Sequence, residues 1–327
     1  MRVAIVGCGL IGAKRARALG TARLTVVCDV NLERAQALAK TVPDVEASAD
    51  WLATVTRPDI DIVVVATIHD QLAPVTAAAV AAGKHVLVEK PGACRAAELE
   101  PIIAAARRTG SRVRVGFNHR YHPALQKARA IADSGVLGPM MFVRGRYGHG
   151  GRPGYDKEWR AVPEKSGGGE LVDQGMHLID LARWFLGDFH DVKGFVPTYF
   201  WDMPVEDNAF LLLRTAGGQV ASLHATWTEW KNLFSLEIYG KQGKLDISGL
   251  GGSYGTEKLT YYKMLPEMGP PETTSWEYPM ADLSWHHEFD AFLEDIRLGR
   301  APSPGLEDAA AALTIVQRIY EQETLAK

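Results

Sequence analysis

The chain has 327 residues, which is too long for one ordinary hydrophobic core and predicts about two domains. Its composition, 46% hydrophobic and 23% charged, is that of a soluble globular protein. The formal net charge of −3 argues against nucleic acid or an anionic membrane surface as a partner.

The cysteines and the apolar runs indicate the compartment. Cys8, Cys28 and Cys94 have no metal-ligand spacing, and an odd number of cysteines does not suggest a disulfide framework. No signal peptide precedes the first predicted strand, and no apolar run approaches the length of a membrane-spanning helix. We therefore expect a cytoplasmic protein.

The first motif is a glycine-rich turn that follows an apolar strand at residues 2–6 and opens a helix. Residues 7–12 read Gly-Cys-Gly-Leu-Ile-Gly, the G-x-G-x-x-G pattern in its strand–turn–helix context. Gly7 permits the tight turn, Gly9 lets the backbone approach a pyrophosphate, and Gly12 lets helix and strand pack closely. The N-terminus of the helix would bind the phosphates.

An acidic residue follows the second strand. This strand is predicted over residues 24–28 and leads to Asp29. A carboxylate there accepts hydrogen bonds from an adenosine ribose and repels a 2′-phosphate, which favours NAD over NADP. A βα turn without a cofactor is the alternative, and the ordered strand, glycines, helix, strand and acid argue against it.

Strands and helices continue to alternate. Apolar strands are predicted at 61–66, 85–88 and 112–116, with alanine-rich helices near 72–82 and 96–108. This alternation predicts a doubly wound parallel sheet, whose ligands bind at the carboxyl ends of the strands. The loops at 67–71, 89–92 and 117–122 should therefore converge on the cofactor. Arg107, Arg108, Arg112 and Arg114 are predicted to form a solvated face.

The strand predicted at 85–88 leads into Glu89-Lys90-Pro91. Pro91 restricts Lys90 to extended geometry, so a lysine at this strand end would point toward the substrate. Burial would lower the pKa of Lys90 and suit it to proton transfer or to polarising a carbonyl oxygen. An exposed loop lysine is the alternative interpretation.

After Pro123 and one further helix the pattern changes. Strands are predicted at 140–147, 191–200, 208–214, 219–227, 234–239 and 244–247, with hairpin turns at 215–218 and 240–243 and closing helices at 285–298 and 306–323. The prediction is a Rossmann domain at residues 1–120 and an α+β domain at 121–327, with an antiparallel sheet that has helices on one face.

Three glycines at residues 167–169 run into a predicted helix over about 170–185. Asp173 and His177 lie four residues apart on it, and Gly175 costs that helix roughly 1 kcal/mol relative to alanine, which predicts a close backbone approach. A paired Asp and His beside such a glycine is typical of a general acid–base site. A core-facing helix with a surface histidine is the alternative.

Further polar residues are candidates for the pocket. Asn118, Arg120, Tyr121 and His122 follow the last Rossmann strand, and the loop at 148–155 precedes the glycine triplet and is a candidate for choosing the substrate. His286-His287 has no third ligand at sensible spacing, so no metal site is predicted.

Together these motifs resemble the Gfo/Idh/MocA oxidoreductase family, typified by glucose-fructose oxidoreductase and inositol 2-dehydrogenase. The resemblance covers essentially the whole chain and rests on the glycine turn, Glu89-Lys90-Pro91, the glycine triplet with Asp173, His177 and Asp180, Trp159-Arg160, and the last helix. It implies a Rossmann domain and a second domain with a large open sheet. Since that sheet often mediates oligomerisation, a homodimer or homotetramer is expected.

The resemblance also implies roles for single residues. Lys90, Asp173 and His177 would form the catalytic set. Cofactor contacts are expected from Gly7, Gly9, Leu10, Ile11, Gly12, Asp29, Thr67, Ile68, His69, Glu89, Lys90, Asn118, Trp159 and Arg160. From the resemblance together with their positions in the chain, substrate contacts are expected from Lys90, Arg120, Tyr121, Tyr155, Lys157, Asp173 and His177.

The predicted function is reversible, NAD-dependent oxidation of a secondary alcohol on a sugar or cyclitol. His177 would take the hydroxyl proton, Asp173 would orient His177, and Lys90 would hydrogen-bond the reacting oxygen. A nucleotide-linked sugar is kept open as substrate by Arg144, Arg146, Arg152 and Lys157. Redox-neutral sugar chemistry with retained NAD and a non-enzymatic cofactor or sugar sensor are two rival functions.

Overall fold

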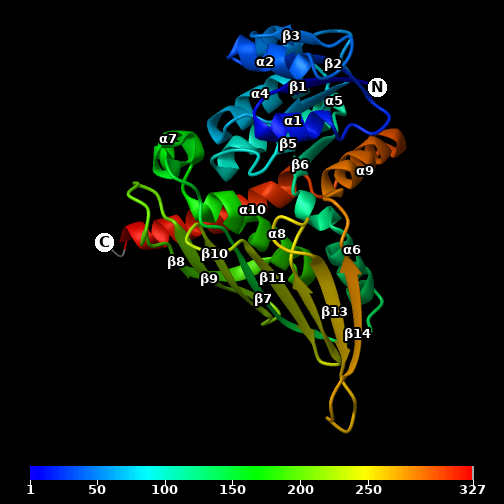
Figure 1. Ribbon diagram of the computed structural model, residues 1–327, viewed down its shortest axis with the longest axis vertical. Coiled ribbons are helices and arrows are strands. Elements are labelled where there is room, and N and C mark those ends of the chain that lie inside the picture. Colours follow the sequence, from blue (N-terminus) through cyan, green and yellow to red (C-terminus); the bar gives the residue numbers. More distant parts are fainter. Residues whose placement is uncertain (326–327) are drawn as a thin grey trace. The chain divides into compact units, whose positions relative to one another are not determined.

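The computed structural model describes residues 1–325, which divide into two compact units (Figure 1). The first unit comprises residues 1–117, 164–167 and 285–313, and the second comprises the remaining described residues. The predicted domain limits at residue 120 stay a prediction. The two compact units differ from the predicted domains, because residues 164–167 and 285–313 group with the N-terminal part of the chain.

The sheet of the first unit has six parallel strands in the order β3-β2-β1-β4-β5-β6. Their bounds are β1 Arg2–Val6, β2 Arg23–Cys28, β3 Glu46–Ser48, β4 Ile62–Val65, β5 His85–Glu89 and β6 Val113–Gly116. The parallel doubly wound sheet predicted from the alternating pattern is confirmed. β3 was not predicted, because three half-exposed residues carry no apolar run.

The first unit also contains helices that alternate with these strands along the chain, and one helix from a distant segment. They are α1 Leu10–Ala16, α2 Leu32–Ala39, α3 Trp51–Val55, α4 His69–Ala81, α5 Glu100–Thr109 and α9 Ser284–Leu298. Phe289 and Phe292 of α9 are fully buried in the same hydrophobic core as Val3, Ile5 and Leu87. Burial of two aromatic rings accounts for the return of this distant segment to the first unit.

The solvated face predicted for four arginines is wrong for Arg114. This side chain is only 1% exposed, and it donates hydrogen bonds to Asp295 and to the carbonyl oxygen of Ser303. A buried guanidinium needs such partners, since an unpaired charge in the interior is costly. The partners are about 180 residues away along the chain, beyond the reach of a local pattern.

The second unit contains an eight-stranded sheet in the order β14-β13-β12-β11-β7-β10-β9-β8 (Figure 1). The strands are β7 Met140–Gly148, β8 Phe189–Phe195, β9 Asn208–Thr215, β10 Val220–Thr226, β11 Leu233–Gly240, β12 Gly243–Ser248, β13 Glu257–Lys263 and β14 Glu272–Tyr278. All neighbouring pairs are antiparallel except the β7–β10 pair, so the predicted, mostly antiparallel sheet is confirmed. β13 and β14 were not predicted; β14 is largely exposed and lacks an apolar face.

One face of this sheet carries helices. α6 (Pro123–Asp133) contacts β12, β13 and β14, and α8 (Met176–Leu186) contacts β7 and β10. Side chains alternate between the two faces of a strand, so the neighbours of the helix-facing Gly145 point to the opposite face. Arg144 and Arg146 are exposed there, and we call this surface the open face. The last helix, α10, spans Leu306–Leu325.

Among residues 1–325, no helix is both long and apolar enough to cross a membrane.

Candidate functional site

The turn between β1 and α1 has close contacts on one side and open space on the other. Gly7 has φ of +99°, and a Cβ at this residue would lie 2.3 Å from the carbonyl oxygen of Ala66. A Cβ on Gly12 would lie 1.9 Å from the carbonyl oxygen of Gly7. At Gly9 no described atom lies within 4 Å of the Cβ position, so a ligand can approach the backbone there. This is the arrangement that a pyrophosphate needs.

Asp29 lies against this turn. Its carboxylate accepts hydrogen bonds from the N–H of Cys8 at 2.9 Å and from the N–H of Asn31 at 2.9 Å, and the residue is 9% exposed. These two bonds hold a negative charge beside the glycine turn, where a ribose hydroxyl can donate to it and a 2′-phosphate is repelled. The residues present therefore fit the adenosine and pyrophosphate parts of NAD.

The remaining predicted cofactor contacts of the first unit follow β4 and β5. Thr67 and Ile68 are half-buried, and His69 is buried with its Nδ1 2.8 Å from the carbonyl oxygen of Ser166. Glu89 ends β5, and the half-buried Lys90 follows it, joined to Pro91 by a cis peptide bond. Lys90 thus directly follows β5, Thr67 lies in the short segment after β4, and His69 is the first residue of α4.

The carboxylate of Glu89 binds Arg15, a residue of α1. The Arg15 side chain is fully buried, and its guanidinium lies 2.6 Å from Glu89 and 2.6 Å from Glu288 of α9. Burial raises the pKa of the Glu288 carboxyl. This ion cluster joins the helix that follows the glycine turn to the strand that leads to Lys90.

In the second unit, a buried carboxylate lies against the glycine triplet. Glu206 accepts hydrogen bonds from the N–H groups of Gly169 at 3.1 Å and Leu171 at 3.0 Å, and from the Tyr320 hydroxyl at 2.6 Å. A Cβ on Gly169 would lie 2.0 Å from the carbonyl oxygen of Glu206, so a side chain has no room there. Burial raises the pKa of Glu206, and the hydrogen bonds oppose that shift.

The helix that carries Asp173 and His177 begins with a π-helical turn, Leu171–Gly175, and continues as α8. Single π turns of this kind are frequent at functional sites. Because the turn adds a residue to the helical repeat, the α-helical face predicted for Asp173 and His177 does not extend across it. The predicted close approach at Gly175 is to Leu171, whose side chain would lie 3.1 Å from a Cβ there.

Asp173 and His177 are both buried, at 7% and 5% exposure. Asp173 accepts a hydrogen bond from Nε of Arg160 at 3.0 Å. The imidazole of His177 stacks on the imidazole of His119, with 3.7 Å between the ring centroids and 19° between the ring planes. Both side chains are therefore buried, which excludes for His177 the surface histidine of the alternative interpretation, whereas the acid–base role of the two residues stays a prediction.

Of the predicted substrate residues in this unit, Arg120 is engaged by a carboxylate. Its guanidinium makes two hydrogen bonds to Asp180, at 2.8 and 2.5 Å, and both side chains are buried. Asn118 donates to the Ser284 hydroxyl at 2.8 Å, and Tyr121 is half-buried.

The predicted residues between 155 and 160 differ in their surroundings. Tyr155 is buried against Trp227, with ring centroids 5.0 Å apart, and burial raises the pKa of its hydroxyl. Lys157 is exposed. The guanidinium carbon of Arg160 lies 4.6 Å from the centroid of the Trp159 ring. Tyr155 is thus a core residue of this segment, whereas Arg160 contacts both the Trp159 ring and the Asp173 carboxylate.

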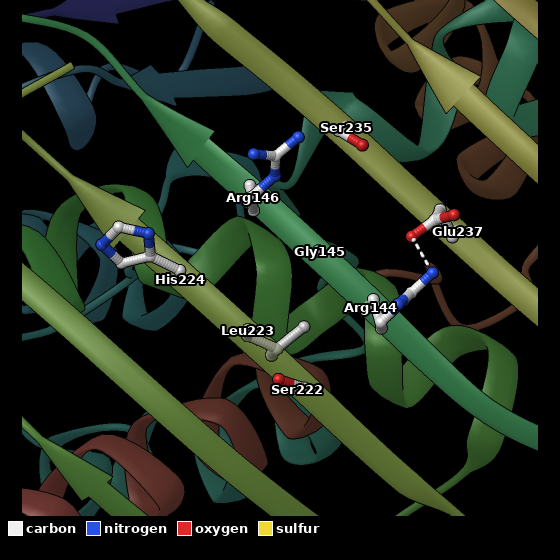
Figure 2. Close-up of a pocket in the computed structure, with 8 residues that line it drawn as sticks. All are labelled: Arg144, Gly145, Arg146, Ser222, Leu223, His224, Ser235 and Glu237. Carbon is white, nitrogen blue, oxygen red and sulfur yellow. Dashed lines mark ion pairs between the residues drawn. The ribbon is translucent and has the colours of Figure 1, made fainter.

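A hollow of about 400 Å³ lies on the open face of the sheet (Figure 2). It is lined by Arg144, Gly145, Arg146, Ser222, Leu223, His224, Ser235 and Glu237. Arg144 pairs with Glu237 at 2.8 Å, and the pKa of His224 is lowered by burial and by Arg146. Arg144 and Arg146 were two of the basic residues that left a nucleotide-linked sugar as a possible substrate. Both lie on the sheet face opposite α8.

Comparison with known proteins gives this architecture a family. Residues 1–117 match the model described as oxidoreductase family, NAD-binding Rossmann fold, and residues 125–246 match the GFO/IDH/MocA C-terminal domain. The chain belongs to the GFO/IDH/MocA oxidoreductase family.

Several relatives carry names. A levoglucosan dehydrogenase from Pseudarthrobacter phenanthrenivorans is 28% identical over 67% of this chain and 63% of its own length. An inositol 2-dehydrogenase from Salmonella paratyphi B is 31% identical over 60% of this chain and 58% of its own length, so the matches span about three-fifths of both relatives. A solved levoglucosan dehydrogenase in complex with NADH is 24% identical and has the same fold, with a TM-score of 0.88 over 98% of this chain and 96% of that one.

Membership of the GFO/IDH/MocA family confirms the resemblance seen in the motifs, the Rossmann fold and NAD as the cofactor. The roles of individual residues stay predictions, since the matches concern whole segments.

Three side chains that shape these GFO/IDH/MocA segments were not predicted. Glu206 and Arg15 belong to none of the motifs identified in the sequence. His119 had a signal, because it lies in the run Asn-His-Arg-Tyr-His after a strand end, where polar residues of this density are typical of a site.

The contact between Gly169 and Glu206 leads to a prediction about stability. Gly169→Ala places a methyl group against the Glu206 backbone, so we expect a loss of about 1–3 kcal/mol in the free energy of unfolding, as for other overpacked sites. Thermal unfolding followed by circular dichroism measures it. Gly269→Ala is the matched control, since its nearest neighbour is 3.9 Å away. Equal melting temperatures for the two variants would contradict the contact.

Proposed function

We propose that the chain is an NAD(H)-dependent dehydrogenase or reductase that moves a hydride between nicotinamide and a secondary alcohol or ketone of a sugar or cyclitol. The observation that carries the proposal is twofold: in a chain of this family, Asp29 lies on the glycine turn, and the buried Asp173, paired with the half-buried Arg160, lies four residues before the buried His177. The names of the relatives support a sugar or cyclitol as substrate.

Since all three cysteines are free thiols, we also propose a cytoplasmic location.

In the proposed reaction, His177 is the general base. It takes the hydroxyl proton as the substrate carbon gives up a hydride, and it returns a proton to the oxygen in the reverse direction. When bound, NAD supplies the hydride-accepting group. Burial of His177 excludes water from the proton-transfer step, which strengthens the electrostatic interactions around it.

Lys90 and Asp173 supply the opposing charges. Lys90 hydrogen-bonds the reacting oxygen and stabilises the negative charge that develops on it. Asp173 stabilises the protonated form of His177, and Arg160 holds Asp173 through the 3.0 Å hydrogen bond. Arg160 thus orients the Asp173 carboxylate, and its predicted contact with the cofactor stays a prediction.

The catalytic assignment predicts a large loss of turnover. His177→Ala or Lys90→Ala should lower kcat by on the order of 100-fold or more, because each removes a group that acts in the transition state. Steady-state assays against a panel of hexoses, pentoses and inositols measure kcat, and fluorescence titration measures NAD binding, which should change little. Lys241→Ala, at an exposed turn, is the control. Wild-type activity in both active-site variants would rule out the assignment.

The position of Asp29 predicts the choice of cofactor. The wild-type protein should use NAD in preference to NADP, and Asp29→Asn should reduce that preference by about tenfold or more by removing the like-charge repulsion. Asparagine keeps one oxygen that can accept from the Cys8 N–H, while the hydrogen bond from the Asn31 N–H is lost. The ratio of kcat/KM for the two cofactors is the measurement. A wild-type preference for NADP would contradict this role of Asp29.

We further propose that copies of the chain associate through the open face as a homodimer or homotetramer. On β9, Leu212 is 55% exposed and Phe210 is 39% exposed. On the adjacent strands β7 and β11, Phe142 stacks on Tyr239 with ring centroids 4.2 Å apart. Apolar side chains gathered beside a polar hollow are typical of a surface that a partner covers.

Association through this face predicts that one charge can disrupt it. Leu212→Asp should shift the protein to a smaller species, because an unpaired carboxylate at the centre of an interface is costly. Sedimentation velocity measures the size of the species. Leu52→Asp is the matched control, since Leu52 is 52% exposed on α3 of the first unit. An unchanged assembly in Leu212→Asp, or a monomeric wild type, would exclude the open face.

A further inference from the structure

Two imidazole rings of the second unit lie face to face. His177 of α8 and His119 of the short 3-10 turn Asn118–Tyr121 have centroids 3.7 Å apart and planes inclined by 19°. Both residues are 5% exposed. A parallel arrangement at this distance is van der Waals contact over the whole of each ring, so His177 cannot rotate its ring plane unless His119 moves.

A second contact fixes the same two segments. Arg120, next to His119, makes its two hydrogen bonds to Asp180, which lies three residues after His177 on α8. Residues three apart on an α-helix project from neighbouring positions on one face. The ring stack and the ion pair are therefore adjacent contacts between the same turn and the same helix, and the bidentate ion pair sets the spacing at which the rings meet.

His119 is itself held in place. Its Nδ1 donates to Oδ1 of Asn118 at 3.3 Å, and Asn118 donates in turn to the Ser284 hydroxyl. The Ser284 hydroxyl donates to Asp282 at 2.6 Å. The edges of three further rings surround His119, those of His122, Tyr147 and Phe234, at centroid distances of 5.7, 5.1 and 6.0 Å. A ring packed on these sides and hydrogen-bonded at its edge is a rigid support.

We propose that His119 is a positioning residue that sets the ring plane of His177 through this stack. Proton transfer requires a nitrogen lone pair aimed at the hydroxyl, and a ring that rotates about χ2 loses that aim. Stacking constrains the plane of the ring without using either nitrogen of His177. The inference rests on the proposed function, in which His177 is the general base.

Two substitutions separate the stack from the chemistry of the imidazole. His119→Ala removes the stacked ring, so kcat should fall by about tenfold while KM for the substrate stays within about twofold. His119→Phe keeps a flat ring in the same place, so kcat should remain within about threefold of wild type. His190→Ala, whose side chain is 78% exposed, is the matched histidine control and should behave as wild type.

Melting temperature, NAD binding and NMR spectra are recorded for every variant, so that a loss of kcat can be separated from a loss of stability or of cofactor binding. Histidine-labelled protein should show an upfield ring-current shift of the His177 carbon-bound protons that is lost in His119→Ala and retained in His119→Phe. The proposal is overturned if His119→Ala keeps wild-type kcat, if its KM rises at constant kcat, or if His119→Phe loses as much kcat as His119→Ala. The His177→Ala variant distinguishes the proposed function from this inference. If His177→Ala is active, the proposed function is wrong. If His177→Ala is inactive and His119→Ala is fully active, only the role of His119 is wrong.

Discussion

The buried carboxylate of Glu206 is the constraint on which the proposed site residues of the second unit depend. Taking a carboxylate out of water is costly unless donors surround it, and here the donors are the backbone of Gly169 and Leu171 and the Tyr320 hydroxyl. The chain closes on Glu206 so tightly that residue 169 has no room for a side chain. The helical segment with Asp173 and His177 therefore starts from a point that Glu206 determines.

Arg15 has the corresponding place in the first unit. Its guanidinium is fully buried between Glu89 and Glu288, and it joins the helix after the glycine turn to the end of β5. A buried ion pair is weak evidence for stability but strong evidence for a defined geometry, because removing either partner leaves an uncompensated charge. In both units a buried ion thus holds the backbone from which the proposed site residues extend.

The sequence predicted most of the elements, but it could not reveal the partners of several side chains. Arg114 was expected in solvent and is buried on Asp295, and Arg120 was expected on the substrate and pairs with Asp180. Tyr155 was expected in the pocket and packs on Trp227. In each case the deciding partner lies on another element, so neither periodicity nor composition around the residue could reveal it.

What the sequence by itself determined is local: the glycine turn with Asp29, the alternating strands and helices, Lys90 at a strand end, and the order of the glycines, Asp173 and His177. Each of these follows from backbone sterics and from the period of burial, which a few neighbouring residues encode. The tertiary structure alone decided that Glu206 meets Gly169, that Arg15 meets Glu288, and that His119 stacks on His177. Such contacts join residues tens to hundreds of positions apart, and they form only when whole elements pack and buried charges must find partners.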